Sequence, residues 1–424
     1  MKKIILGCIL LAVVAGLAVD GYLWMRRPQV IVMSDGTKVT YLGCSYGRHH
    51  VPPRVKLPGG GYRRANISID STNDTLVVWM EAQTKPNQWP NYNLLVYDLA
   101  HTACVSTWTR NSSQVRNGVQ LQGFELDAYP RWDRKLALRL MSWGAGGQRT
   151  SKEQIVISNP ARRGPFEKWT PEAIPVTHSD GDLDVTLTKL TYGVRGFGGG
   201  NIPPNDPAKK AVATVFHTVQ NGVVVTNWQP VRIETSDASG NTVANSSWSN
   251  SRESNGDADM NYQWGLWPEQ TPWKLRVEMS RTSGFNDNEL WTVQQVPLNR
   301  GSQQDLWNYA NRNSRADTPF AETTLNGIHL KLYPAVLFTD QNWGDGRNHG
   351  GFRVFADPEP EGIRMTILKV TDEQGRPLEY WDGGSGGGNY TFQLPNLRNT
   401  KSLNLTVALH KSRFVEFTVN PEKP

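Results

Sequence analysis

The sequence predicts an all-β protein in which three tandem β-sandwich repeats follow an N-terminal transmembrane helix or signal peptide. Three observations in its 424 residues support this prediction. One apolar segment lies at the start of the chain, short β-branched and aromatic runs dominate the rest, and a set of landmarks recurs three times in the same order. The 3 cysteines exclude a disulfide-dense scaffold, and no Gly-X-Y or heptad pattern indicates collagen or a coiled coil.

The first segment, residues 1–27, is predicted to be a signal anchor or a signal peptide. Its apolar stretch from Ile4 to Met25 is long enough to cross a bilayer, at roughly 33 Å as a helix with a rise of 1.5 Å per residue. Small residues near Ala18 also suit a cleavage site, so both interpretations stay open. We favour the anchor, because apolar character resumes after Asp20 and ends at Arg26 and Arg27. Either interpretation places the bulk of the chain outside the cytoplasm: a single-pass membrane protein with a periplasmic or cell-surface bulk, or a secreted protein if the segment is cleaved.

Strand patterns dominate the remaining residues. The runs are short, rich in β-branched and aromatic types, and separated by Gly, Pro, Asn and Asp, which is typical of strands joined by turns. Examples are 75–80, 93–97, 223–225, 365–368 and 414–419. One stretch with helical spacing, 303–313, is predicted to be a short linker helix.

Four landmarks recur in the same order along the chain, which indicates an internal repeat. They are a tyrosine at a strand end, an aspartate that opens a turn, a leucine in an alternating strand, and a proline after a closing strand. The steps between equivalent landmarks range from 124 residues (Pro297 to Pro421) to 146 (Tyr46 to Tyr192). The sets are Tyr46, Tyr192 and Tyr333; Asp98, Asp237 and Asp372; Leu138, Leu275 and Leu405; and Pro160, Pro297 and Pro421.

The repeat predicts three β-sandwich domains at 28–160, 180–298 and 322–424, with linkers at 161–179 and 299–321. Domains of about this size with alternating strands and no long helix resemble the immunoglobulin- or fibronectin-like β-sandwich class. The resemblance covers everything after residue 27 and identifies no specific family. It implies a fold and no function.

The cysteines offer one candidate crosslink. Cys44 and Cys104 lie mainly where the other two copies have apolar residues, and outside the cytoplasm they are candidates for a disulfide. Two buried, unpaired thiols are the alternative.

No catalytic, cofactor-binding or metal-binding residue is predicted. The serine-hydrolase pattern at 43–47 is rejected, because the segment after Gly47 does not open a helix. A second match at 383–387, in a glycine loop, is rejected too. His49 and His50 suit a loop better than a metal site, and the acidic segment 257–261 fails the calcium-loop pattern. Asp340, Asp345 and His349 are a metal or enzyme candidate only if the fold brings them together.

The 16 tryptophans are the feature that most suggests a ligand. Trp343 and Trp381 lie beside glycine loops and are candidate glycan-binding residues, because flat indole faces stack on sugar rings. The net charge of +6 adds a weak attraction to acidic polymers or anionic surfaces, and no Lys or Arg run is dense enough for a nucleic acid.

We therefore expect a membrane-anchored, extracytoplasmic protein, without cofactors, that presents its domains for protein contacts in the cell envelope. A glycan-binding module that uses loop tryptophans is the alternative. A hydrolase acting on envelope polysaccharide comes third, and the expected partners are the membrane and an envelope protein or polysaccharide.

Overall fold

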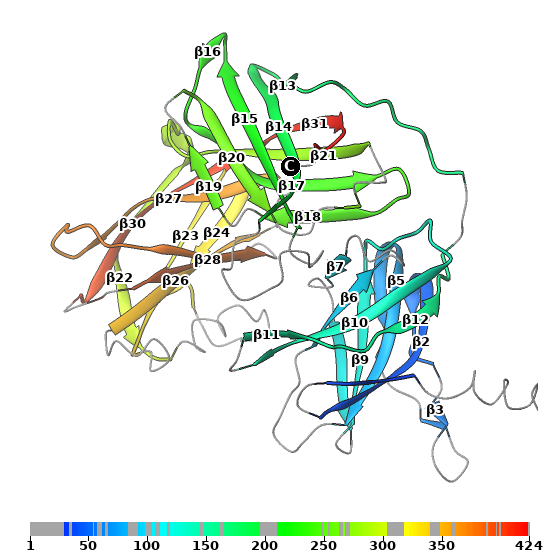
Figure 1. Cartoon of the computed structure of the whole chain (residues 1–424). Coiled ribbons are helices and arrows are strands. Elements are labelled where there is room, and N and C mark those ends of the chain that lie inside the picture. The colour runs from blue at the N-terminus through cyan, green and yellow to red at the C-terminus, as the bar shows by residue number, and fades with distance from the viewer. Residues whose placement is uncertain are drawn as a thin grey trace, which may run out of the picture.

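The computed structural model shows an all-β protein (Figure 1). It describes residues 29–422 apart from a set of internal segments. The predicted anchor at 1–27 and the predicted linker helix at 303–313 lie outside the described residues. Within the described part of the chain, no helix combines the length and the apolar character that a membrane span requires. The segments left out are 34–35, 54, 57–61, 64–66, 84–91, 98–103, 107–110, 117–118, 145–146, 162–164, 196–209, 247–248, 253–254, 263–265, 268–271, 303–317, 340–347, 358–361, 387–388, 396 and 398–399.

The first core lies between two antiparallel sheets. Its buried side chains, such as Leu76, Phe124 and Leu138, come from both sheets. A separate hairpin is formed by β3 (Val55–Lys56) and β4 (Tyr62–Arg63). One sheet has the order β1 (Val30–Val32), β2 (Lys38–His50), β5 (Ile69–Gln83), β9 (Val119–Leu126), β8 (Asn111–Arg116). The other has the order β11 (Gly147–Thr150), β10 (Lys135–Gly144), β6 (Tyr92–Tyr97), β7 (Cys104–Ser106), with β12 (Ile155–Ser158) also paired to β10.

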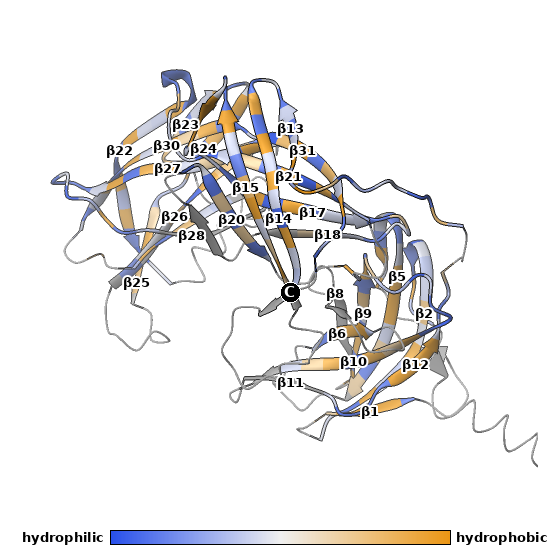
Figure 2. Ribbon diagram, turned by 45° about the horizontal axis from the view of Figure 1, so that its top comes forward, coloured by the Kyte–Doolittle hydropathy of each residue, from blue (hydrophilic) through white to orange (hydrophobic). Residues whose placement is uncertain are grey.

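The second core also lies between two sheets, and its strands alternate as the sequence predicts. In β14, Leu183, Val185 and Leu187 are buried while their neighbours are half-exposed, and Figure 2 shows this alternation as changes of colour along the strand. One sheet has the order β13 (Val176–Asp180), β14 (Leu183–Arg195), β15 (Lys210–Gln220), β20 (Asp257–Tyr262), β19 (Ser249–Arg252), with β16 (Val223–Val224) paired to β15. The other has the order β18 (Thr242–Ser246), β17 (Trp228–Asp237), β21 (Trp273–Arg281), β31 (Arg413–Val419).

The third core is enclosed by one nine-stranded sheet. The strand β22 joins its two halves, because it pairs in parallel with β25 and antiparallel with β30. A short 3-10 helix, η2 (Asp287–Glu289), precedes β22. The order is β23 (Ala321–Leu325), β24 (Ile328–Leu332), β26 (Asn348–Asp357), β25 (Ala335–Thr339), β22 (Leu290–Arg300), β30 (Ser402–Lys411), β27 (Ile363–Asp372), with β29 (Asn389–Leu394) on β26 and β28 (Trp381–Gly386) on β29.

The strands that carry the predicted leucine landmark occupy equivalent places in the three cores. Leu138 of β10, Leu275 of β21 and Leu405 of β30 each lie on a strand that pairs with the strand before the aspartate turn. On its other side each landmark strand pairs with a closing strand, which is β12, β31 and β22 respectively. The repeat and its boundaries stay predictions.

Two closing strands are exchanged between the second and third cores. The strand β22 directly follows β21 of the second core but pairs with β30 of the third. The strand β31 directly follows β30 of the third core but pairs with β21 of the second. The segments β21–β22 and β30–β31 therefore run side by side as one two-stranded ribbon through both cores, which we call the shared ribbon.

The predicted aspartate turns form in the second and third cores. In each turn the carboxylate accepts backbone N–H bonds, and the glycine has positive φ, 89° at Gly240 and 80° at Gly375. Glycine has no Cβ to oppose that conformation, and the aspartate carboxylate satisfies the N–H groups that the turn leaves open. The corresponding turn of the first copy, from Asp98 to His101, lies outside the described residues.

The first and second cores meet through the Asp237 turn. Asn241, fully buried at the end of this turn, accepts a hydrogen bond from the Arg131 Nε at 2.9 Å and one from the Tyr129 backbone N–H at 3.1 Å. Nearby, Trp132 packs edge-on against Trp267 of the second core with ring centroids 5.4 Å apart. The Asp237 turn of the second core therefore positions Asn241 for its contact with the first core.

The shared ribbon predicts that a residue near the C-terminal end of the sequence stabilises the second core. Phe417 of β31 is fully buried and its ring lies 5.2 Å from that of His178 and 6.2 Å from that of Phe216. We expect Phe417→Ala to lower the free energy of unfolding by about 3–5 kcal/mol, because it leaves a cavity in that core. Urea unfolding followed by tryptophan fluorescence measures the change. Phe320→Ala is the matched control, since Phe320 is 41% exposed, and equal losses for the two variants would contradict the placement of β31.

Candidate functional site

A cleft of about 560 Å³ lies where the shared ribbon passes between the second and third cores. We call it the seam cleft. Its wall includes the β21–β22 connection and the turn between β30 and β31, together with the end of β15 and the start of β17. Its lining is polar except for one indole and one glycine: Gln220, Asn227, Trp228, Arg281, Gly284, Asn286, Glu289, Lys411 and Arg413.

One side of the seam cleft is built around Arg281. Its guanidinium binds the carboxylate of Glu289 and donates to the Gly284 carbonyl at 2.9 Å. Its Cζ lies 5.7 Å from the ring centroid of Trp228, in the range of a cation–π contact. The other Glu289 oxygen accepts the backbone N–H of Asn286 at 2.8 Å, so the loop that lines the cleft is held by its own side chains.

The other side of the seam cleft has a cation that is neutralised and one that is not. Arg413 donates to Asp182 at 3.2 Å and lies 3.5 Å from a carboxylate oxygen of Asp180. Asp182 also accepts a bond from Gln220 at 2.8 Å, which holds the amide at the cleft wall, and these hydrogen bonds and the Arg413 charge lower the pKa of Asp182. Lys411 is exposed, and no carboxylate within the described part of the chain pairs with it.

A buried polar joint links the two cores, and it includes Ser412, the neighbour of the cleft residue Lys411 in the chain. Glu278 of β21 accepts two hydrogen bonds from Arg364 of β27, at 2.6 and 2.7 Å, and one from Ser412 at 2.8 Å. Burial acts to raise the pKa of Glu278, but the bonds from Arg364 and Ser412 and the Arg364 charge outweigh it, so the pKa is lowered. The carboxylate therefore stays charged inside the joint.

His410 lies in the same joint and is fully buried. Its Nε2 lies 3.4 Å from the Ser280 hydroxyl and 3.3 Å from the Thr366 hydroxyl, and its ring lies 5.0 Å from that of Phe285. Burial, assisted by the charge of Arg281, lowers its pKa from 6.5 to about 4. His410 is therefore neutral at neutral pH.

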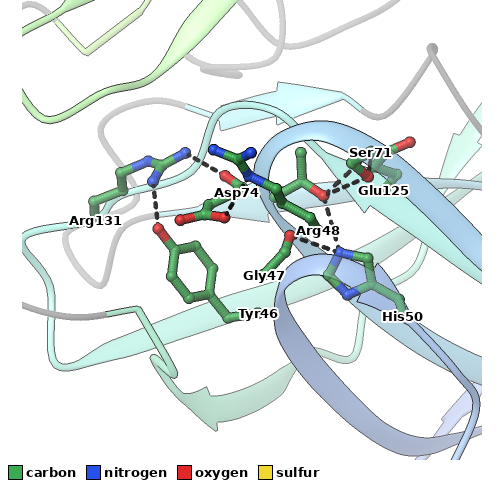
Figure 3. Close-up of polar contacts among 9 residues, drawn as sticks. Tyr46, Gly47, Arg48, His50, Ser71, Asp74, Glu125 and Arg131 are labelled. Atoms are coloured by element: carbon green, nitrogen blue, oxygen red, sulfur yellow. Dashed lines mark hydrogen bonds and ion pairs between the residues drawn. The ribbon is translucent and has the colours of Figure 1, made fainter.

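A second polar cluster lies on the first core, between β2, β5 and β9 (Figure 3). The His50 Nε2 lies 2.9 Å from the Gly47 carbonyl, which only accepts, so this nitrogen donates and Nδ1 accepts from the Ser45 hydroxyl at 2.8 Å. Thr75 links the ring to the buried carboxylate of Glu125, to which it donates at 3.2 Å. We interpret this cluster as structural, because each buried polar group is held by the next.

The Arg131 side chain extends that cluster toward the second core, and Figure 3 shows it directed at Tyr46 and the Asp74 backbone. It donates to the Tyr46 hydroxyl at 3.2 Å and to the Asp74 carbonyl at 3.4 Å. The same guanidinium binds Asn241, so it carries the contact between the first two cores.

The structure describes only part of the residues singled out from sequence. Trp343, Asp340 and Asp345 lie outside the described residues. Trp381 lies in β28, opposite Gln393, and its side chain lies outside the described part, as does that of Cys104 in β7. Cys44 packs against the first core, where burial raises the pKa of its thiol. The glycan-binding role of the two tryptophans and the Cys44–Cys104 disulfide stay predictions.

The structure tests two sequence predictions about the end of β2. The loop expected around His49 and His50 is wrong: both end the strand β2, and they face opposite ways, His50 buried and His49 exposed beside Asp70. The prediction that no helix follows Gly47 is confirmed, because the strand continues to His50. Within the described ranges, no three His, Cys, Asp or Glu side chains are grouped to hold a metal ion.

Sequence reasoning missed the seam cleft. Its residues are ordinary polar types from three separate stretches, 220–228, 281–289 and 411–413, and no spacing rule connects them. Comparison with known proteins adds no assignment: no protein-family model and no curated protein matches the chain.

The buried His410 predicts a stability that falls on mild acidification. The folded pKa, about 4, is below the ordinary 6.5, so the unfolded chain takes up the proton first as the pH falls. The contribution of neutral His410 to the free energy of unfolding is full above pH 6.5. It is lost as the pH falls toward 4, and the total loss is about 3 kcal/mol. Urea unfolding between pH 7 and 4 should show a shallower decline for His410→Gln than for the unmodified chain. Parallel curves for the two proteins would contradict a buried neutral His410.

Proposed function

We propose that the protein is a membrane-anchored, extracytoplasmic binding protein that takes a saccharide of the cell envelope in the seam cleft. The β-sandwich domains would hold this cleft away from the membrane, and the segment 1–27 would anchor them. The observation that carries the proposal is the cleft itself, a polar hollow of about 560 Å³ at the joint of two cores.

The lining has the chemistry that recognises hydroxyl groups. Asn227 and Asn286 bring amides, which both donate and accept, and Arg281 brings a guanidinium held by its own partners. The Gln220 amide is bonded at both ends, to Asp182 and to Trp228, and forms a fixed part of the wall. Trp228 is buried, and its indole N–H donates to the Gln220 amide oxygen at 3.2 Å, so it fixes the cleft wall and offers no free face to a sugar. Because their neighbours already hold Gln220 and Arg281, a ligand would meet a largely preformed site.

The lining favours binding over glycoside hydrolysis. That reaction generally needs two carboxyl groups on either side of the scissile bond. In the described lining of the cleft Glu289 is the one carboxylate, and Arg281 and the Asn286 backbone hold it. A hydrolase acting on envelope polysaccharide therefore stays the third proposal.

Protein contact in the envelope is the second candidate function. Val30 and Val32 are 39% and 43% exposed on β1, which forms one edge of its sheet. An edge strand with exposed apolar side chains is suited to pair with another chain. On this three-residue strand Val30 and Val32 are the exposed apolar side chains, so we place this surface after the saccharide cleft.

The proposal predicts that one exposed amide of the cleft contributes to saccharide binding. In a glycan array probed with the full chain in lipid nanodiscs, Asn286→Ala should weaken binding to the bound glycans roughly fivefold, since one hydrogen bond is worth about 1 kcal/mol. Gln154→Ala, an exposed amide on the first core, is the matched control and should bind as the unmodified chain does.

A double variant, Trp343→Ala with Trp381→Ala, separates the cleft from the predicted loop-tryptophan platform. Loss of glycan binding in this variant, with binding unchanged in Asn286→Ala, would move the site to the tryptophans. The absence of any bound glycan would overturn the proposal and leave protein contact as the first candidate.

A further inference from the structure

The hairpin that brings Gln220 to the seam cleft also carries an apolar side chain that the fold does not bury. The hairpin of β15 and β16 turns at Asn221 and Gly222, whose φ angles are 52° and 78°. The next residue, Val223, is 65% exposed, the most exposed of the large hydrophobic side chains in the described part of the chain. A tight turn of this kind is set by its Asn-Gly pair and does not need a valine after it.

The pairing of the hairpin places Val223 opposite a cleft residue. Gln220 and Val223 are directly opposite partners in the antiparallel pair of β15 and β16. Side chains of opposite partners lie on the same face, about 5 Å apart at Cβ. Gln220 lines the cleft, so the pairing puts Val223 on the face of the hairpin that carries a cleft residue, next to the lining.

The adjacent valine, Val224, lies on the opposite face of the hairpin. Val224 pairs with Val219 and so lies on the other face of the hairpin. A Cβ placed on Gly256 would come 2.5 Å from the Val224 side chain, so Val224 packs closely against that glycine. Val224 is 49% exposed and packs against Gly256 on that other face, whereas Val223 is 65% exposed on the face that carries Gln220.

The seam cleft also contains an exposed cation. Among the described cleft residues, Arg281 and Arg413 have carboxylate partners, while Lys411 has none. Lys411 lies on the β30–β31 side of the shared ribbon, whereas Val223 comes from the β15–β16 hairpin. A ligand in the cleft would therefore meet amides, one available ammonium group and one apolar residue next to the lining.

We propose that the ligand of the seam cleft is an amphiphile: an acidic saccharide that carries an apolar chain, as in a lipid-linked saccharide. Its anionic group binds Lys411, its hydroxyl groups bind the amides, and the start of its apolar chain contacts Val223. The inference rests on the proposed function, and it adds the charge of the ligand and its apolar part.

Three small ligands and two variants test each part separately. The ligands are hexyl glucuronide, methyl glucuronide and hexyl glucoside, which differ by the chain or by the charge. The proteins are the unmodified chain, Val223→Ser and Lys411→Gln, as full chains in nanodiscs, with empty nanodiscs as the reference for partition into lipid. Isothermal titration gives the dissociation constants, and Val30→Ser is the matched control for an exposed valine elsewhere.

The unmodified chain should bind hexyl glucuronide about tenfold more tightly than methyl glucuronide, because a few methylenes are buried against Val223. Val223→Ser should remove most of this gain and leave methyl glucuronide binding unchanged. Lys411→Gln should weaken both glucuronides about fivefold and leave hexyl glucoside unchanged. Val30→Ser should behave as the unmodified chain.

The outcomes distinguish the inference from the proposed function. Equal binding of the hexyl and methyl glucuronides, unaffected by Val223→Ser, overturns the apolar part and leaves a saccharide cleft. Equal binding of glucuronide and glucoside, unaffected by Lys411→Gln, overturns the acidic part. If none of the three ligands binds, both the inference and the proposed function are overturned.

Discussion

The shared ribbon is the constraint on which the second and third cores depend. The second core needs β31 to complete the sheet beside β21, and the third core needs β22 to join the two halves of its sheet. Each core therefore takes a closing strand from the segment next to the other. Because backbone hydrogen bonds of a strand are satisfied only when it is paired, neither core closes its sheet without the other. This mutual dependence predicts that the two cores behave as one unit.

The polar joint at the crossing point explains why the cleft lies where it does. The two segments of the shared ribbon, β21–β22 and β30–β31, pass from one core to the other. Between the cores they cross a region that is filled mainly by polar side chains. The joint is filled by the bonded group of Glu278, Arg364 and Ser412, and by the neutral His410. A buried ion pair is a weak source of net stability, because desolvation opposes its attraction. We interpret this pair as fixing the register of the crossing, and the cleft is the space that the same crossing leaves open at the surface.

The sequence predicted the local features well, for physical reasons that act over few residues. Strand alternation is a property of the chain itself, so residues such as Leu138 and Leu275 could be assigned to a core. The turns at Asp237 and Asp372 were predictable because the aspartate and glycine lie within the turn. Pairing between distant strands was not predictable, since β31 is compatible in pattern with a sheet of either core. The seam cleft depends on that pairing, so no sequence pattern indicates that Trp228 and Lys411 line the same cleft.

Hydrogen exchange along the shared ribbon tests the central claim most directly. Amides of β31, such as Val415 and Phe417, belong to the second core, and amides of β22, such as Val293 and Val296, belong to the third. If the ribbon makes the two cores one cooperative unit, both sets should lose protection together as denaturant is raised, with the same free energy of opening. If β31 loses protection at a lower denaturant concentration than β22, the cores open separately and the shared ribbon does not hold the seam cleft together.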